Sequence, residues 1–191
     1  FLGIRYVSRE TFGEEVQIQL VDAPEQGALT LPDVLFQNQV DEWLTITSLP
    51  KQPLSMWDVA SSFLEAKVIK SPIQVIYGRL LREGRWIDQN GKSVRLGLDI
   101  FGSAFFMLTR YEEIVLPDRD EHDRFPAKAS LTFQEGFLDR PIVDEYVEIL
   151  WACMKHLWPG LKRKQRSYKI FLSHDVDHPI GAVTKPWLQV V

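Results

Sequence analysis

The chain has 191 residues, 45% of them hydrophobic and 25% charged, which are the proportions of one folded domain of ordinary size with a substantial core. Its 22 basic and 26 acidic side chains give a net charge of −4, which argues against a nucleic-acid-binding protein that relies on phosphate attraction. No apolar run reaches the roughly 18 residues of a membrane-spanning helix. The chain has one cysteine, Cys153, which excludes an internal disulfide and favours a cytoplasmic location.

The N-terminal third of the sequence has the pattern of β-strands. Residues 3–9, 16–21 and 27–32 alternate polar and apolar side chains or are rich in β-branched residues, with glycine or proline at their borders. Residues 43–47 are a fourth candidate strand. Residues 48–67 contain two prolines, so we expect a loop there with one helical turn.

Two further strand signals follow in the middle of the chain. Residues 71–78 have the apolar run of a buried strand, which ends at Gly78. Residues 85–98 contain Asn90-Gly91 between two alternating runs, and this dipeptide is the strongest short-range signal for a β-hairpin.

Residues 98–115 predict an amphipathic helix. Asp99 can cap its first turn, because a carboxylate at that position accepts a hydrogen bond from a free backbone N–H. The predicted apolar face consists of Ile100, Ala104, Met107, Leu108 and Tyr111, with Phe101 and Phe105 beside it.

A second helix is predicted from Pro141 to about Trp158. It has proline in its first turn, acidic residues early and basic residues late, as the helix dipole favours. The polar, proline-bounded residues 117–137 before it predict a long loop. We expect one contiguous core between the two helices and the sheet, containing Phe105, Leu108, Ile149 and Leu150.

Strands on both sides of two main helices predict an α/β domain, or an α+β domain, with a mixed β-sheet. The basic segment 161–167 is the expected linker between a domain of residues 1–167 and the start of a second domain at residues 168–191. Residues 168–175 have the pattern of a last strand, and its apolar residues should pair with the sheet or pack under its helices. Because the chain begins with Phe and ends in an apolar stretch, we expect a fragment of a longer protein.

The segment KIFLSHDVDHPIG, residues 169–181, contains the best candidate for a chemical site: His174, Asp175, Asp177 and His178. On a strand, the two aspartates share a face, and their carboxylates repel unless a cation or a shared proton separates them. One could hold a metal while the other takes a proton from a metal-bound water, as metal-assisted hydrolysis requires. The alternative is a strand end with capping histidines and solvated acids, and spacing alone leaves both interpretations open.

The segment FLSHDVDHP resembles the first motif of the polysaccharide deacetylases, metal-dependent enzymes with a chitooligosaccharide-deacetylase-like barrel. Upstream, the segments LGLDIFGSAFFMLTRYEE, RFPAKASL and GFLDRPIVDEYVEILW resemble an uncharacterised domain that precedes such a catalytic domain in bacterial proteins. The likeness spans most of residues 71–179, whereas residues 1–70 match more loosely.

The resemblance implies that Asp175 is the general base and Asp177 a metal ligand, with His178 as a further candidate ligand. The usual motif has two adjacent acids followed by glycine; here Val176 separates the acids, a form that related deacetylases also have. The remaining ligands would be histidines far downstream, and no histidine of this chain lies beyond residue 178. We therefore expect a divalent metal, Zn²⁺, in the parent protein and none in this fragment.

The same resemblance predicts an inactive N-terminal accessory region of a sugar N-deacetylase. Its partners would be the missing C-terminal deacetylase domain and a carbohydrate substrate. The alternative from another class is a non-catalytic module that binds a glycan or an assembly partner. Of the six tryptophans, Trp43, Trp57 and Trp86 are the exposed candidates for stacking on sugar rings.

Charged residues gather between the two predicted helices and at their ends. Their paired signs favour an ion-pair network that fixes the long loop. The alternative is a surface that contacts the catalytic barrel or a ligand, with Arg110, Glu113, Arg124, Asp139 and Arg140 as its candidate residues.

A remote alternative is a metal-dependent nuclease. Pro32-Asp33 and Glu65-Ala66-Lys67 mimic the PD…ExK pattern, whose acids and lysine gather around Mg²⁺. Such short patterns often arise by chance, and the acidic balance of the chain is wrong for binding DNA.

Overall fold

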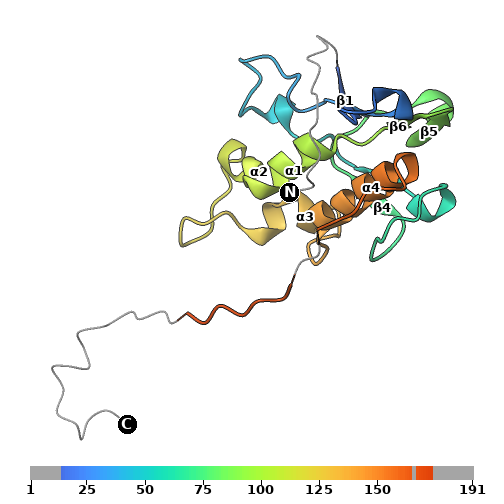
Figure 1. The fold of residues 1–191 in the computed structure, drawn as a ribbon. Helices are drawn as coiled ribbons and strands as arrows, with labels where there is room; N and C mark the ends of the chain where they lie inside the picture. Colours follow the sequence, from blue (N-terminus) through green and yellow to red (C-terminus); the bar gives the residue numbers. More distant parts are fainter. Residues whose placement is uncertain (1–13, 165–166, 174–191) are drawn as a thin grey trace, which may run out of the picture.

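The computed structural model describes residues 14–164 and 167–173 (Figure 1). The predicted strand at 3–9 lies outside this part of the chain. The strands are β1 Glu15–Gln19, β2 Ala28–Pro32, β3 Ser55–Trp57, β4 Ile73–Val75, β5 Ile87–Asn90 and β6 Ser93–Leu96. The α-helices are α1 Ile100–Leu108, α2 Tyr111–Val115, α3 Leu131–Gln134 and α4 Ile142–Leu157. Short 3₁₀ helices are η1 Pro24–Gln26, η2 Ile46–Ser48, η3 Val59–Ser61, η4 Arg82–Gly84 and η5 Ala127–Ala129.

The main sheet is mixed, as predicted, and the α/β class is confirmed. Its strand order is β1-β2-β6-β5. The β1–β2 and β5–β6 pairs are antiparallel, whereas β2 and β6 run parallel in the centre. Strands β3 and β4 form a separate antiparallel ribbon. The described residues form no closed barrel.

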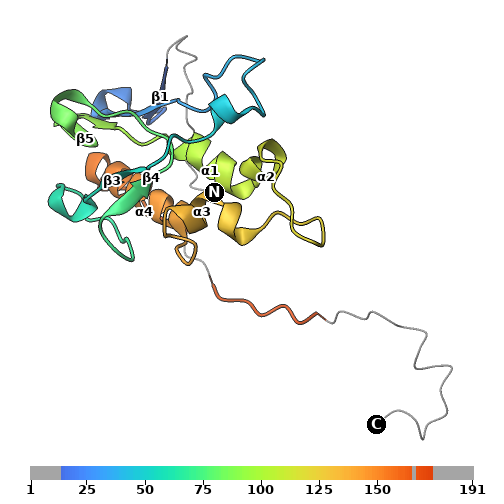
Figure 2. The same cartoon turned by 180° about the vertical axis from the view of Figure 1, so that it is seen from behind.

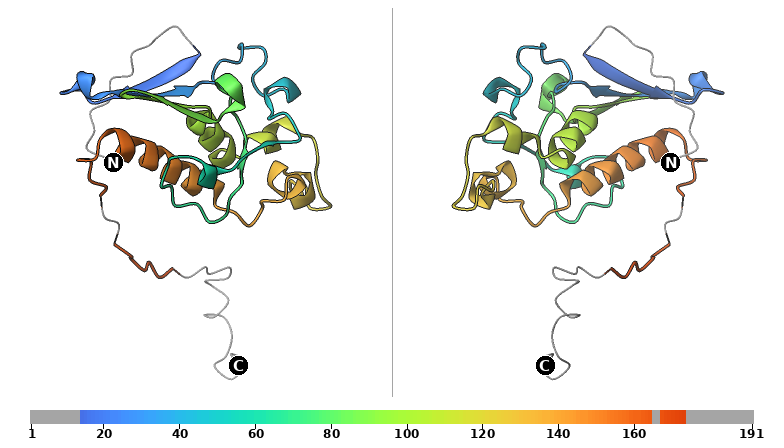
Figure 3. Two further views of the ribbon diagram at one scale, coloured as in Figure 1. Left: turned by 90° about the vertical axis from the view of Figure 1, so that its right-hand side faces the viewer. Right: turned by 90° about the vertical axis from the view of Figure 1, so that its left-hand side faces the viewer.

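The elements lie in layers around α4. In Figure 3 the four-stranded sheet covers α1 and α4 from one side, and α4 packs against β2, β6 and α1. The opposite side of α4 faces the β3–β4 ribbon, which lies across the molecule from the sheet (Figure 2). Tyr146 links α4 to this ribbon, because its hydroxyl accepts a hydrogen bond from Ile76 N (3.1 Å) and donates one to Gln74 O (2.7 Å). The core therefore lies on both sides of α4.

The predicted hairpin is present as β5 and β6. Asn90 pairs with Ser93, so the two turn residues are Gly91 and Lys92, one position later than the Asn90-Gly91 signal indicates. Gly91 has φ = +57°, a left-handed conformation that glycine adopts without steric cost. In β6, Val94 is buried between exposed neighbours, as expected for a sheet with one face on the core.

The segment between β2 and β4 differs most from the prediction. Residues 43–47 form a turn that leads into η2 rather than a strand. Residues 48–67 contain η3, the expected helical turn, but also β3, which the prolines obscure. Strand β4 is short, and it pairs with β3 through Trp57 and Ile73.

The predicted helix 98–115 is divided into α1 and α2. Arg110 between them has φ = +55°, which ends the α-helical hydrogen-bond pattern and restarts it in a new direction. Asp99 caps α1 as predicted, with Gly102 N donating to its carboxylate at 2.7 Å. The loop predicted at 117–137 contains η5 and α3, so that expectation was only partly correct.

The buried face of α1 is rotated from the predicted one. Ile100, Ser103 and Phe106 are buried, whereas Phe105 is 37% and Leu108 73% exposed, so the predicted core positions of Phe105 and Leu108 are wrong. Ser103 can face the core because its Oγ accepts a hydrogen bond from Tyr77 N at 3.1 Å. Its hydroxyl thus behaves as a satisfied core group, which an apolar count overlooks.

Helix α4 agrees with the prediction in position and orientation. Ile149 is fully buried, and Leu150 packs at the edge of the same core. After α4 the chain turns back along it: Lys155 Nζ donates to the carbonyls of Pro159 and Leu161. Arg163 forms a 2.5 Å ion pair with Glu148 and lies 5.8 Å from the centre of the Trp151 ring.

Residues 167–173 do not form the predicted last strand. Phe171 and Leu172 are 85% and 90% exposed, and no regular secondary structure is assigned to this segment (Figure 1). The prediction that these residues pair with the sheet or pack under its helices is therefore wrong for the part of the chain that is described. Among the described residues, no helix is long and apolar enough to cross a membrane.

Candidate functional site

The predicted metal motif, with Asp175, Asp177 and His178, lies outside the described residues. Within residues 14–164 and 167–173, no three His, Cys, Asp or Glu side chains are grouped so that they could hold a metal ion. The other candidate features of the described domain are its charged clusters and its hollows.

The charged residues of the loop region form local contacts. Arg110 pairs with Glu113 at 2.5 Å, three residues further along the chain. Arg124 pairs with Asp120 at 3.1 Å, and Asp120 also accepts a hydrogen bond from Arg124 N at 2.9 Å. These bonds hold the pKa of Asp120 below its ordinary value. The Arg124–Asp120 pair fixes the long loop, as the ion-pair interpretation predicts, whereas the Arg110–Glu113 pair lies at the start of α2.

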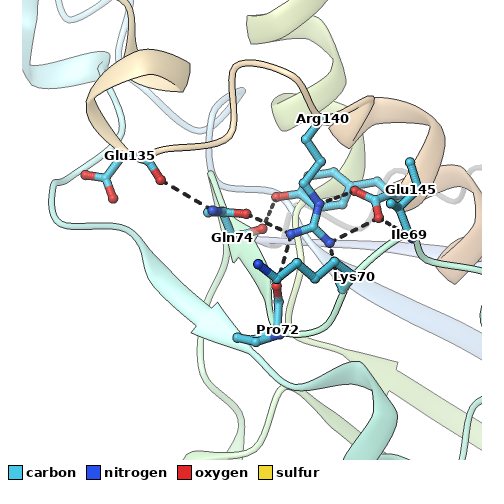
Figure 4. Close-up of polar contacts among 8 residues, drawn as sticks. Ile69, Lys70, Pro72, Gln74, Glu135, Arg140 and Glu145 are labelled. Atoms are coloured by element: carbon cyan, nitrogen blue, oxygen red, sulfur yellow. Dashed lines mark hydrogen bonds and ion pairs between the residues drawn. The ribbon is translucent and has the colours of Figure 1, made fainter.

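Arg140 has a different environment, shown in Figure 4. Its side chain is 10% exposed and pairs at 2.5 Å with Glu145, whose side chain is 3% exposed. The guanidinium also donates to Pro72 O (3.0 Å), to Gln74 Oε1 (3.3 Å) and to Lys70 O.

The carboxylate of Glu145 completes this buried cluster. Its Oε1 accepts a hydrogen bond from Ile69 N at 2.7 Å as well as one from Arg140 at 3.0 Å. Nearly every N–H group of the Arg140 guanidinium thus donates a hydrogen bond to an acceptor inside the protein. The cluster joins the segment before β4 to the start of α4, which is a structural task. Asp139, which directly precedes Arg140, is exposed and stays a candidate for contact with a neighbouring domain.

A second buried carboxylate, Asp99, holds the start of α1 against the end of β2. Its Oδ2 accepts hydrogen bonds from Val34 N (2.8 Å) and Leu35 N (3.0 Å). Burial raises the pKa of Asp99 above its ordinary value, although these backbone N–H groups act in the opposite direction. Gly102 is required here, since an added Cβ would lie 2.3 Å from Asp99 Oδ2 and 2.7 Å from Leu35 Cβ.

A network of hydroxyl groups lies beside η2. Tyr77 donates to Ser48 O at 2.6 Å, and Ser48 Oγ lies 2.9 Å from the hydroxyl of Tyr111. The Tyr111 hydroxyl also accepts a hydrogen bond from Leu44 N at 2.7 Å. The hollow that Ser48 and Tyr77 line here has a volume of about 480 Å³, and the hydroxyl groups of both residues already have protein partners. It is therefore a poor candidate for a ligand site.

A hollow with a distinctive composition lies between η3 and β5. It has a volume of about 460 Å³, within the range of small-molecule sites. We call it the aromatic groove and define it by Trp57, Ser61, Phe63, Arg85, Trp86 and Asp88. Trp57 is 5% exposed, which corrects the prediction that its ring is an exposed platform; Trp86 is half-buried and Phe63 is 42% exposed.

The aromatic groove lies beside the C-terminal end of α4. The ring of Phe63 lies 5.0 Å from the ring of His156, measured between centres. His156 Nε2 is 3.1 Å from Oε1 of Gln89, a residue of β5 that also lines the groove. The last turn of α4, from which the chain continues, therefore contacts both walls of the groove.

The residues of the nuclease pattern have local surroundings. Asp33 Oδ1 accepts a hydrogen bond from Phe36 N and its Oδ2 one from Gln37 Nε2, both at 3.1 Å. This is the geometry of a turn-capping aspartate. Glu65 lies exposed in the loop between η3 and β4.

The fold and these surroundings define a mixed α/β domain with a buried ion pair at one end of α4 and an aromatic groove at the other. The chain belongs to a family of unknown function, DUF7033, whose family model matches residues 1–159. Neither a curated protein nor a solved structure matches the chain.

Proposed function

We propose that this chain is the N-terminal accessory region of a metal-dependent polysaccharide deacetylase, with the deacetylase-like domain starting at residue 168. The observation that carries this proposal is the segment SHDVDHP, which follows the DUF7033 match and resembles the first motif of those enzymes. In that motif Asp175 is the general base and Asp177 a metal ligand.

The arrangement of the described residues supports this division of the chain. Residues 14–164 bury their own core, with Leu29, Tyr146 and Ile149 at less than 1% exposure. Lys155 and Arg163 hold the chain against α4 as far as residue 163. The apolar side chains of residues 170–172 then face solvent, and the proposed downstream domain would cover them.

In the proposed reaction, a divalent metal would polarise the acyl carbonyl of an N-acylated sugar, and Asp175 would take a proton from the attacking water. Asp177 would hold the metal, with His178 as a further candidate. The accessory domain would contribute positioning and carbohydrate contact but no chemical step.

The test uses two proteins in parallel. A longer natural chain that includes the downstream histidines should release acetate from acetylated chitooligosaccharides when Zn²⁺ is supplied, and Asp177→Asn should abolish this. The 191-residue chain should bind Zn²⁺ no tighter than about micromolar, because structural zinc sites need more ligands than this motif supplies. Nanomolar Zn²⁺ binding by the 191-residue chain, or a longer chain that releases no acetate, would contradict the proposal.

A further inference from the structure

The aromatic groove combines a fixed aromatic ring with polar side chains at its rim. The Trp86 ring lies directly on two glycines: Cβ atoms added at Gly78 and Gly97 would lie 3.1 Å from its Cζ3 and Cε3 atoms, respectively. The backbone carbonyl of Trp86 accepts a hydrogen bond from Gly97 N at 2.7 Å. The ring is therefore held in place without help from a ligand, so binding against it costs little side-chain entropy.

Among the residues that line the groove, the charges of Arg85 and Asp88 balance each other. The guanidinium of Arg85 lies 3.0 Å from Glu83 and 3.4 Å from Asp88. A phosphate or carboxylate would have to compete with these acidic groups for Arg85, and a cation would have to compete with Arg85 for the acids. The groove therefore favours a neutral ligand that has both an apolar face and hydrogen-bonding groups.

Hydroxyl groups with spare acceptor capacity lie on the opposite wall. Ser61 Oγ donates to Asp58 O at 2.7 Å, and Ser62 Oγ donates to Val59 O at 2.7 Å. A serine oxygen that donates one bond keeps lone pairs that can accept others. The hydroxyl groups of a ligand can donate to them, while the remaining N–H groups of Arg85 can donate to the ligand.

A pyranose ring has this combination of properties. One face of the ring presents C–H groups, which pack on the face of an indole, and its edge presents hydroxyl groups. We propose that the aromatic groove binds a neutral N-acetylhexosamine unit of a polysaccharide, with Trp86 and Phe63 as its stacking residues. The choice of an N-acetylated sugar rests on the proposed function, whereas the preference for a neutral sugar rests on the groove itself.

The first experiment titrates N-acetylchitotetraose into the 191-residue chain, with calorimetry and tryptophan fluorescence as readouts. A single weak site is expected, with Kd between about 0.01 and 1 mM, as for small exposed sites with few contacts. Trp86→Ala should weaken binding at least about tenfold, and Phe63→Ala about three- to tenfold. Trp86→Phe keeps a ring and should retain most of the affinity.

Phe133→Ala is the matched control, because Phe133 is also an exposed phenylalanine, on α3, and does not line the groove. Its affinity should stay within about twofold of the parent chain. If Trp86→Ala does not fold, as judged by its unfolding transition, the comparison of Phe63→Ala with Phe133→Ala decides. Absence of binding at 10 mM sugar, or equal affinity for Phe63→Ala and Phe133→Ala, would overturn the proposal.

This outcome is separable from that of the proposed function. Sugar binding by the 191-residue chain needs no metal and no residue beyond 173, whereas acetate release by the longer protein depends on Asp175 and Asp177. A chain that binds the sugar while the longer protein releases no acetate would support the groove and contradict the deacetylase. The reverse result would contradict the groove alone.

Discussion

The buried ion pair between Arg140 and Glu145 predicts a large loss of stability when one partner is removed. In Arg140→Ala the Glu145 carboxylate, 3% exposed, would keep a single described hydrogen bond, the one from Ile69 N at 2.7 Å. The carbonyl of Pro72 would lose its Arg140 donor at the same time. An uncompensated buried charge costs about 3–5 kcal/mol, so we expect the free energy of unfolding to fall by that amount.

Urea unfolding measures this loss through the midpoint of the transition, provided that the slope with denaturant stays constant. Arg110→Ala is the matched control, because Arg110 also pairs with a glutamate at 2.5 Å but its side chain is 72% exposed. Exposed pairs of this kind contribute about 0–1 kcal/mol. Similar losses in the two variants would refute the reasoning, since they would mean that water compensates the Glu145 charge.

The double variant Arg140→Met/Glu145→Met separates the charge from the packing. It removes both charges and keeps side chains of similar length, so it should recover about 1–3 kcal/mol relative to Arg140→Ala. A double variant that is less stable than Arg140→Ala would show that the bonds from Arg140 to the segment before β4 outweigh the buried charge.

Three further predictions follow from the core. Phe106→Ala should cost about 3–5 kcal/mol in urea unfolding and Leu108→Ala less than about 0.5 kcal/mol, because Phe106 is buried and Leu108 faces solvent; the reverse order would mean that α1 has the face predicted from its sequence. Gly102→Ala should cost about 1–3 kcal/mol through its clash with Asp99, whereas Gly160→Ala, with no atom within 4 Å of the added Cβ, should change stability little. Burial raises the pKa of the Cys153 thiol from 9.0 to about 12, so the folded state keeps a proton that the unfolded state releases above about pH 9. The free energy of unfolding should therefore fall as the pH rises from about 9, and Cys153→Ala should flatten this fall. An equal dependence of stability on pH in both proteins would contradict the raised pKa of Cys153.

The parts of the fold that the sequence predicted depend on local signals. The hairpin follows from a turn dipeptide between alternating runs, and α4 from an apolar face with charges suited to its dipole. The division of α1 from α2 could not be predicted in this way, because the left-handed conformation of Arg110 has no sequence signal of its own. The face of α1 was misjudged because Ser103 is buried through a bond to Tyr77, a partner that is distant in the sequence.

Prediction of the candidate site residues from the sequence has the same limit, because their surroundings depend on distant segments. Trp86 was identifiable as a stacking candidate, but its support by Gly78 and Gly97 depends on the pairing of three separate segments. The sequence places Arg140 among the surface candidates because arginine is mostly exposed in folded proteins and the charged Asp139 precedes it. Its buried position depends on Glu145 in the first turn of α4 and on the carbonyl groups of residues 70 and 72, which are distant in the sequence and approach Arg140 only in the folded structure.

Helix α4 gives the two proposals a common geometric basis. Its first turn is fixed by Arg140, its centre by Tyr146, and its last turn contacts the aromatic groove through His156. Arg163 then holds the continuing chain against Glu148 on the same helix. Because one rigid helix contacts both the groove and the start of the linker, a sugar bound in the groove would lie in a fixed relation to residue 163. Under the proposed function, a polysaccharide held there would stay close to the deacetylase-like domain proposed to start at residue 168, which would raise its effective concentration at that domain without any need for a large interface.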